Sequence, residues 1–271
     1  MDYAKQYPGV KLPSIWFIQE SVRRNSLQTA QPKKKTKGGS KYLLYPEEAI
    51  KQLGHIHQSG DFIGKKYIDK QTEPINIFST SYYSPFKLFQ IKRVLASKTV
   101  YVYPVLINLW KNFPIPDVYR IDNALTFRGT ARGKRFISPF LKFILNLNII
   151  PLFGAPSKPW TNPHVEGHNR TFDVKVWRNN RFANLEQIDV ECNRFNQESL
   201  DLFDFKYRDN LIFIKRKRYL TEKSKIEYAK LKTIENKKIY FIRFVENKDI
   251  RNNSFVTVLN EKVIIPEQYD H

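Results

Sequence analysis

Cysteine is nearly absent from this sequence, because Cys192 is the single cysteine among 271 residues. One cysteine cannot form a disulfide within the chain, and it excludes a zinc site built from several cysteines of one chain. We therefore expect a protein of a reducing compartment, the cytoplasm.

Long hydrophobic runs are also absent. The sequence has no signal peptide and no run of about 18 uncharged apolar residues, which is the length that a membrane-spanning helix needs. The closest stretch, residues 136–153, is interrupted by polar residues and prolines, so it predicts a buried helix followed by a strand. We expect no membrane partner.

Acidic residues are scarce relative to basic ones. The chain has 26 Asp and Glu against 46 Lys and Arg, which gives a formal net charge of +20. Such an excess repels itself in a compact protein unless a polyanion is nearby. With 41% hydrophobic and 14% aromatic residues, the chain can still bury a substantial core. Nucleic acid is the first partner to consider.

The order of the elements predicts an α/β core with a mixed sheet of five strands. Three β-rich runs at residues 61–68, 75–83 and 86–94 are separated by turn residues, which indicates an antiparallel meander. The elements expected after them are a helix at about 97–113, a strand at 117–122, a helix at about 135–147, a strand at 149–153 and helices beginning near 163 and 185.

Smaller elements flank this core. Residues 12–27 have helical spacing and a capping signal at Ser14. The basic segment 31–41 combines Pro, Gly and like charges, which is typical either of a linker that contacts phosphate or of a merely solvated run. Short strands at 239–245, 254–259 and 262–266 predict a small C-terminal β module.

One glutamate stands out in a basic segment. Between residues 151 and 182 the only acids are Glu166 and Asp173, against five lysines and arginines. Asn162 is a plausible N-cap and Pro163 suits the first helical position, which puts Glu166 on the first or second turn of a helix. At 100° per residue, Glu166 shares one helix face with Asp173 and with Arg170 and Trp177.

The two histidines beside Glu166 face away from it. A helical zinc site of the HExxH kind needs two histidines four residues apart with the glutamate directly after the first of them. The order here is His-Val-Glu-Gly-His, so zinc is disfavoured and we expect His164 and His168 to face solvent or DNA.

Two further acids are candidates for the same site. Asp122 ends the strand at 117–122, where ligand sites form in open α/β sheets, although a turn-forming Asp-Asn is the plain alternative. Asp61 lies at the head of the first predicted strand. Together with Glu166 they could converge to bind two divalent cations through oxygen ligands, and such a pair clamps both oxygens of a phosphodiester displacement.

Three segments carry a family resemblance. DFIGKKYI (61–68), YRIDNALTF (119–127) and PSKPWTNPHVEGHNRTF (156–172) resemble the catalytic core of insertion-sequence transposases in the retroviral-integrase superfamily. The resemblance covers roughly residues 55–182 and implies a ribonuclease-H-like fold. Asp61, Asp122 and Glu166 match the Asp-Asp-Glu triad of that family, with 60 and 43 residues intervening.

Some positions depart from the family pattern. The second gap is longer than usual, and the basic insert at 128–135 accounts for the excess. Ala124 stands where the family has Gly, and Gly60 precedes the first acid where an apolar residue is usual. Asp69 is a rival for the first acid, but it lies beyond the matching motif.

The resemblance implies an activity and its partners. A water-derived hydroxyl would cut a phosphodiester at a transposon end, and the freed 3′-OH would attack target DNA, with two Mg²⁺ or Mn²⁺ ions as cofactors. Partners would be double-stranded DNA and further copies of the chain, in the nucleoid of a prokaryotic cytoplasm. The DNA-binding candidates are Lys158, Trp160, Arg170, Arg178 and the linker residues Lys33, Lys34 and Lys35. Trp160 is equally well interpreted as a core aromatic that braces its loop.

The resulting domain prediction has five parts. These are a partial helix-turn-helix remnant (1–30), a basic linker (31–53), the catalytic core (54–184), a helical connection (185–204) and a small β module (205–271). Because the chain begins after the first DNA-reading helices of such transposases, we expect an N-terminally truncated copy. Two alternatives stay open: a catalytically degenerate protein that only binds DNA, and a ribonuclease-H-like nuclease.

Overall fold

The structure is a computed structural model, and it falls into two units, Met1–Leu44 and Tyr45–His271. The described residues are 14, 20–21, 45–68, 73–129, 137–207, 218–222, 224, 236–245, 247–248 and 254–266. The predicted linker with Lys33, Lys34 and Lys35, the rival Asp69 and most of the basic insert lie outside these ranges, as does most of the predicted helix 12–27.

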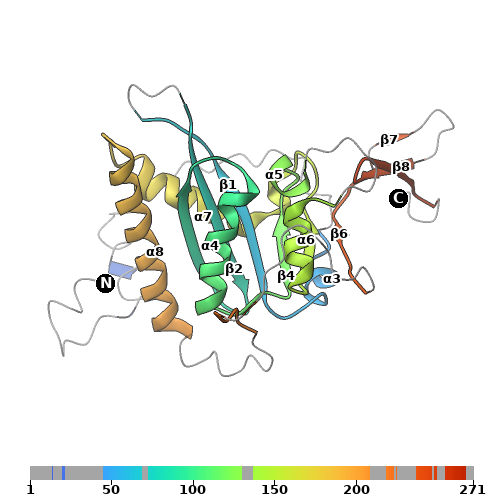
Figure 1. Cartoon of the computed structure of the whole chain (residues 1–271), viewed down its shortest axis with the longest axis horizontal. Coiled ribbons are helices and arrows are strands. Elements are labelled where there is room, and N and C mark those ends of the chain that lie inside the picture. The colour runs from blue at the N-terminus through green and yellow to red at the C-terminus, as the bar shows by residue number, and fades with distance from the viewer. Residues whose placement is uncertain are drawn as a thin grey trace. The chain divides into compact units, whose positions relative to one another are not determined.

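The core is a six-stranded mixed sheet with strand order β3-β2-β1-β4-β5-β6 (Figure 1). Its strands are β1 (His57–Lys66), β2 (Ile75–Ser84), β3 (Leu88–Val94), β4 (Val118–Ile121), β5 (Ile150–Phe153) and β6 (Tyr240–Phe241). The first three form an antiparallel meander, and β4 pairs in parallel with both β1 and β5. This is a ribonuclease-H-like α/β fold, which confirms the predicted fold class, although the sheet was predicted with five strands and β6 adds a sixth.

Helices cover both faces of the sheet. They are α3 (Glu47–Lys51), α4 (Thr99–Asn112), α5 (Leu125–Arg128), α6 (Pro139–Asn146), α7 (Pro163–Phe172) and α8 (Leu185–Tyr207), with a π-helical segment, η2 (Asp173–Trp177), directly after α7. Trp110 of α4 and Phe143 of α6 pack on one face, whereas Phe172 and Ile188 pack with Ile77 on the other. Burial on both faces explains why β2 reads as an almost continuous buried run.

A buried polar network ties β1 to its neighbours. Trp110 Nε1 donates to Gln58 Oε1 at 2.8 Å, and Gln58 Nε2 donates to Thr80 Oγ1 at 2.8 Å. Thr80 Oγ1 in turn bonds the Ser59 carbonyl at 2.7 Å and lies 3.1 Å from the Tyr119 hydroxyl. Because unpaired polar groups are costly when buried, this network favours one register among β1, β2 and β4.

Helix α8 covers the open edge of β3. Asn196 accepts from the Ile91 amide and donates to the Ile91 carbonyl, both at 2.8 Å, and Ser199 Oγ accepts from the Phe89 amide at 2.8 Å. Side chains of α8 therefore bond the backbone groups that a seventh strand would use. This protects the edge from pairing with another chain.

Two sequence predictions need correction here. β1 begins at His57, not at residue 61, because the polar residues Gln58 and Ser59 find buried partners and so belong to the sheet. The strand predicted at 239–245 is reduced to β6 and joins β5 in the core sheet, rather than the C-terminal module. The small antiparallel sheet contains β7 (Asn247–Lys248), β8 (Ser254–Val258) and β9 (Glu261–Ile264).

The apolar stretch 136–153 contains α6 and β5, as predicted. Among the described residues, no helix is both long and apolar enough to span a bilayer.

Candidate active site

Asp61 lies in the middle of β1, which corrects its predicted place at the head of a strand. The glycine before it has a structural cause: a Cβ on Gly60 would lie 2.1 Å from the Tyr119 hydroxyl. The Tyr119 side chain, which reaches across from β4, therefore requires Gly at position 60. One Asp61 oxygen accepts from the Phe62 amide at 2.7 Å.

Asp122 directly follows β4 and lies beside Asp61. The last pair in the β1–β4 ladder is Gly60 with Ile121, so each aspartate comes one residue after the same pair. Asp122 Oδ1 accepts from the Ala124 amide at 2.9 Å, which fixes the turn that the Asp-Asn sequence begins. The two carboxylates are thus brought together by strand pairing, although 60 residues separate them.

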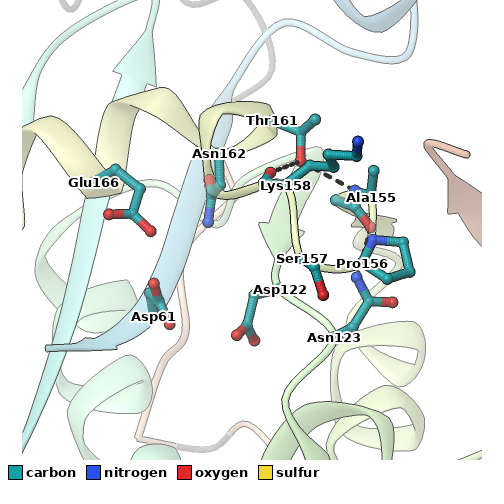
Figure 2. A pocket seen from close by; sticks show the side chains of 11 residues that line it. Asp61, Asp122, Asn123, Ala155, Pro156, Ser157, Lys158, Thr161, Asn162 and Glu166 are labelled. Carbon is teal, nitrogen blue, oxygen red and sulfur yellow. Dashed lines mark hydrogen bonds between the residues drawn. The ribbon is translucent and has the colours of Figure 1, made fainter. Parts of the chain in front are cut away.

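Glu166 completes the set from the first turn of α7, as predicted. Asn162 occupies the N-cap position and Pro163 the first helical position, although the Asn162 side chain makes no capping bond. Figure 2 shows the Glu166 carboxylate directed towards Asp61, with Asp122 facing the same space.

The three carboxylates line one cavity of about 360 Å³. Its other lining residues come from the turn after β4 and the segment from β5 to α7: Asn123, Gly154, Ala155, Pro156, Ser157, Lys158, Thr161 and Asn162. Burial, with the charges of Asp122 and Glu166 adding to it, raises the pKa of Asp61 to about 8. Burial also raises the pKa of Asp122 and of Glu166, the latter helped by the charge of Asp122.

This charge distribution fits a cation. Each carboxylate would be easier to ionise beside a positive charge, and carboxylate oxygens are the ligands that Mg²⁺ prefers. Within the described part of the chain, no three His, Cys, Asp or Glu side chains form a group that could hold one ion. Mg²⁺ is usually held by one or two protein carboxylates, with water and substrate phosphate as its other ligands. Any ion at this site would therefore be held by one or two of these carboxylates, with water and a phosphate as its other ligands.

The predicted DNA contacts are placed unevenly around this cavity. Lys158 lines it, and Arg170 is exposed one turn beyond Glu166. Trp160 is not among the lining residues. It packs against Phe244 with ring centroids 5.3 Å apart, as expected for an aromatic residue that braces its loop. Arg178 is exposed and pairs with Asp173 at 2.7 Å. Their roles towards DNA stay predictions.

His168 overturns the expectation of a histidine that faces solvent or DNA. It is 2% exposed, stacks on Phe89 and Phe195, and has Nδ1 3.2 Å from Ser79 Oγ. Burial lowers its pKa to about 3, so it is a neutral core residue. The aromatic partners lie on β3 and α8, far away in the sequence, so helical spacing alone could not show them.

The segment after α7 also differs from the regular helix assumed for it. Residues Asp173–Trp177 form a π-helix, so the 100° spacing does not continue to the end of the segment. Asp173 pairs with Lys66 of β1, whose ammonium lies 5.6 Å from the Trp177 ring. These residues join α7 to β1 and are not part of the cavity lining.

Comparison with known proteins identifies no family for this chain. No protein-family model and no curated protein matches this sequence. Among solved structures, the chain is similar to one described as "CryoEM structure of simian T-cell lymphotropic virus intasome in complex with PP2A regulatory subunit B56 gamma". The identity is 12% and the TM-score 0.41, over 65% of this chain and 59% of that chain. The match is distant.

Sequence reasoning missed one residue near the cavity, Arg243. Its guanidinium donates to Asn123 Oδ1 at 3.0 Å, to the Gly154 carbonyl at 2.9 Å and to the Thr257 carbonyl at 3.0 Å. Asn123 also donates to the Gly154 carbonyl at 2.6 Å. Arg243 therefore links the C-terminal part of the chain, residues 236–266 (the tail), to the turn that presents Asp122. No local signal marked it, since it lies in an apolar run that predicted only a strand.

Proposed function

We propose that this protein is a DNA transposase or integrase that cuts a phosphodiester and joins the resulting 3′ end to target DNA, with Mg²⁺ or Mn²⁺ as cofactor. The observation that supports it best is that Asp61, Asp122 and Glu166 line one cavity, although they come from three separate elements. The net charge of +20 adds a reason for a nucleic-acid substrate.

The three carboxylates would hold two divalent cations. When bound, such ions stabilise the charge on the attacking and leaving oxygens of an in-line displacement. Asp61 is the most buried of the three and lies on β1, which pairs with β2 on one side and with β4 on the other, so it would fix the position of the metal site. Asp122 and Glu166 would complete it from a turn and from a helix.

We propose that neighbouring groups bind the phosphate. Asn162 is 3% exposed, and neither its side-chain nitrogen Nδ2 nor its side-chain oxygen Oδ1 has a hydrogen-bond partner in the structure. It lines the cavity at the N-terminus of α7, where the helix dipole favours an anion. Asn162 would donate to a phosphate oxygen, and Lys158 would add a positive charge at the rim.

The proposed substrate is double-stranded DNA, both the transposon end and the target. Since cutting and joining involve two DNA segments, we also propose that the protein acts as a homo-oligomer on DNA. Basic residues outside the cavity, such as Arg170, would contact the phosphate backbone.

The test is strand nicking and joining on labelled DNA with Mg²⁺ or Mn²⁺. Glu166→Gln preserves the side-chain size and removes the metal-binding charge, so we expect it to abolish both reactions. The matched control is Glu198→Gln, which makes the same change on α8 at a residue paired with Arg194. It should leave both reactions unchanged.

The possible outcomes separate the proposal from its alternatives. Cutting without joining in the unmodified protein would favour a ribonuclease-H-like nuclease. Salt-sensitive DNA binding without cutting would favour a protein that only binds DNA. Cutting that survives Glu166→Gln would mean that the reaction occurs elsewhere or comes from a contaminant.

A further inference from the structure

A second cavity lies against the first turn of α7. Its volume is about 510 Å³, and the residues that matter for its chemistry are Arg120, Tyr45, Tyr83, His57 and His164. Asn162 and Glu166 line the candidate active site, whereas Pro163 and His164 line this second cavity. The two cavities thus share the N-terminal turn of one helix.

Arg120 is an unusual residue to find in a sheet. It is 2% exposed, and its Nε and Nη1 atoms are buried without a hydrogen-bond partner. Among the described residues no carboxylate forms an ion pair with it. A buried guanidinium whose N–H groups lack acceptors is costly, so the position calls for an anion.

Aromatic rings compensate only part of this charge. The guanidinium carbon of Arg120 lies 5.4 Å from the Tyr45 ring centroid and 5.1 Å from that of Tyr83. Such contacts stabilise a cation through the ring face, and the Tyr45 hydroxyl also accepts a hydrogen bond from the Arg120 side chain, but neither gives an acceptor to Nε or Nη1. The unbonded donors therefore still need an oxygen.

The strand pattern aims Arg120 at the same side of the sheet as the active site. Tyr119 and Ile121 belong to the core on the α4 and α6 face, so Arg120 points to the opposite face, towards α7. Asp122 follows two residues later and lines the candidate active site. A strand of DNA whose phosphate occupies that site would therefore pass close to Arg120.

The positive charge of this cavity comes from Arg120 and not from its histidines, whose pKa values are lowered. Burial, and next the charge of Arg120, lowers the pKa of His164 to about 4. Burial and the same charge also lower the pKa of His57. Among the residues that line this cavity the one acid is Glu47, which pairs with Lys51 at 3.3 Å.

We propose that this second cavity binds a phosphate group of a DNA strand, held by the Nε–H and Nη–H groups of Arg120. The fork of an arginine bonds two phosphate oxygens at once, which explains a guanidinium here rather than an ammonium. The cavity is larger than a phosphate needs. His164 is an exposed residue whose ring stacks on Tyr83 on one face, with centroids 4.1 Å apart, and its other face offers a surface for the adjoining base. This inference rests on the proposed function, because it takes DNA as the ligand.

Entry of the phosphate requires one covering side chain to move. Tyr45 is the candidate, because its hydroxyl bonds the Thr161 carbonyl only at the long distance of 3.4 Å, and its hydrogen bond to Arg120 is one that a phosphate oxygen could replace. Thr161 also bonds the backbone on the active-site side, at Ala155 and Lys158. Displacement of Tyr45 would therefore leave the active-site loop in place.

The direct test follows the Nε–Hε resonance of Arg120 by NMR in the full-length Glu166→Gln protein, which should bind DNA without cutting it. The probes are a short DNA duplex, the same sequence as a single strand, and inorganic phosphate. We expect a saturable shift of this resonance with DNA, and Arg120→Lys identifies the signal by removing it. A shift with inorganic phosphate that DNA does not displace would overturn DNA as the ligand, and no shift with any probe would overturn the site.

The second measurement is the salt dependence of DNA binding. Arg120→Met loses the charge-assisted bonds to the phosphate, so it should weaken binding by roughly 10- to 100-fold. It should also reduce the slope of log affinity against log salt concentration by about 1, the value for one phosphate contact. His164→Ala changes an exposed ring and keeps the core intact, so it should weaken binding about tenfold if a base stacks there. The control Lys142→Met removes one positive charge from α6, on the opposite face of the sheet.

These results separate this inference from the catalytic proposal. If the unmodified protein never cuts DNA but the Arg120 resonance still responds to it, the cavity assignment stands and the transposase proposal falls. If the protein cuts DNA while Arg120→Met, His164→Ala and Lys142→Met bind it equally, the catalytic proposal stands and the cavity assignment falls.

Discussion

Arg243→Met is expected to loosen the turn that presents Asp122. The guanidinium makes two charge-assisted bonds to this region, to Asn123 and to the Gly154 carbonyl. Burial, with Arg128 adding to it, lowers the pKa of Arg243 to about 10, so the group is still charged at neutral pH. Bonds of this kind contribute about 1.5–3 kcal/mol each when well buried. Since Arg243 is only partly buried, we take about 2–3 kcal/mol for the pair.

This free energy sets the size of the expected effects. A loss of 2–3 kcal/mol raises the local opening equilibrium roughly 30- to 150-fold, because each 1.4 kcal/mol is a factor of ten. Hydrogen exchange of the Ala124 and Gly154 amides should accelerate by that factor. If the proposed activity holds, metal-dependent cutting should fall by about 10- to 100-fold, which is the usual effect of removing a partner that orients a metal ligand.

The control for this prediction is Lys237→Met. Lys237 lies in the same tail and bonds Asn148, away from the cavity, and its replacement causes the same loss of charge. Equal exchange rates at the Ala124 and Gly154 amides in both variants would refute the anchoring role of Arg243. The exchange measurement decides this even if the protein proves to be catalytically silent.

Three other changes test the fold that supports the site. Asn196→Ala removes two bonds to the edge of β3 and should cost about 2–4 kcal/mol in urea denaturation, whereas Gln197→Ala, one residue along α8, should cost under about 0.5 kcal/mol. Gly60→Ala should cost about 1–3 kcal/mol by overpacking against Tyr119, and adding Tyr119→Phe should recover part of that loss; full additivity of the two costs would contradict the proposed clash. The folded-state pKa of His168 lies near 3, below its unfolded value of 6.5, so its contribution to stability is complete above pH 6.5 and is lost as the pH falls towards 3, by up to about 5 kcal/mol. In His168→Phe the free energy of unfolding should fall less steeply with pH between 6.5 and 3, because the residue no longer takes up a proton. An unchanged dependence on pH would contradict a buried neutral His168.

Much of the sheet could be predicted from local patterns. The runs that became β2, β3, β4 and β5 are apolar and bounded by turn residues, so their positions were predicted within a few residues. The start of β1 was not, because Gln58 and Ser59 look like loop residues until their partners on β2 and α4 are known. A polar residue in a sheet is recognisable only through contacts distant in sequence.

The same distinction applies to the candidate site. The turn at Asp122 and the helix start at Asn162 and Pro163 have local signals, so both were predictable. The parts that were missed depend on residues that the fold brings from elsewhere. Arg243 reaches the cavity from the tail. Arg120 can be recognised as a candidate only in the folded structure, where its buried Nε and Nη1 atoms have no hydrogen-bond partner.

The short strand β4 connects the core, the second cavity and the candidate active site. Tyr119 and Ile121 face the core, whereas Arg120 and Asp122 line cavities on the other side. Because side chains alternate along a strand, a slip of one residue between β1 and β4 would exchange these two pairs and destroy both cavities at once. The bond between Thr80 and Tyr119 opposes such a slip, since Tyr119 would lose its buried partner. Stability and any chemistry at this site therefore depend on the same register, and a substitution in the buried polar network should affect both cavities together.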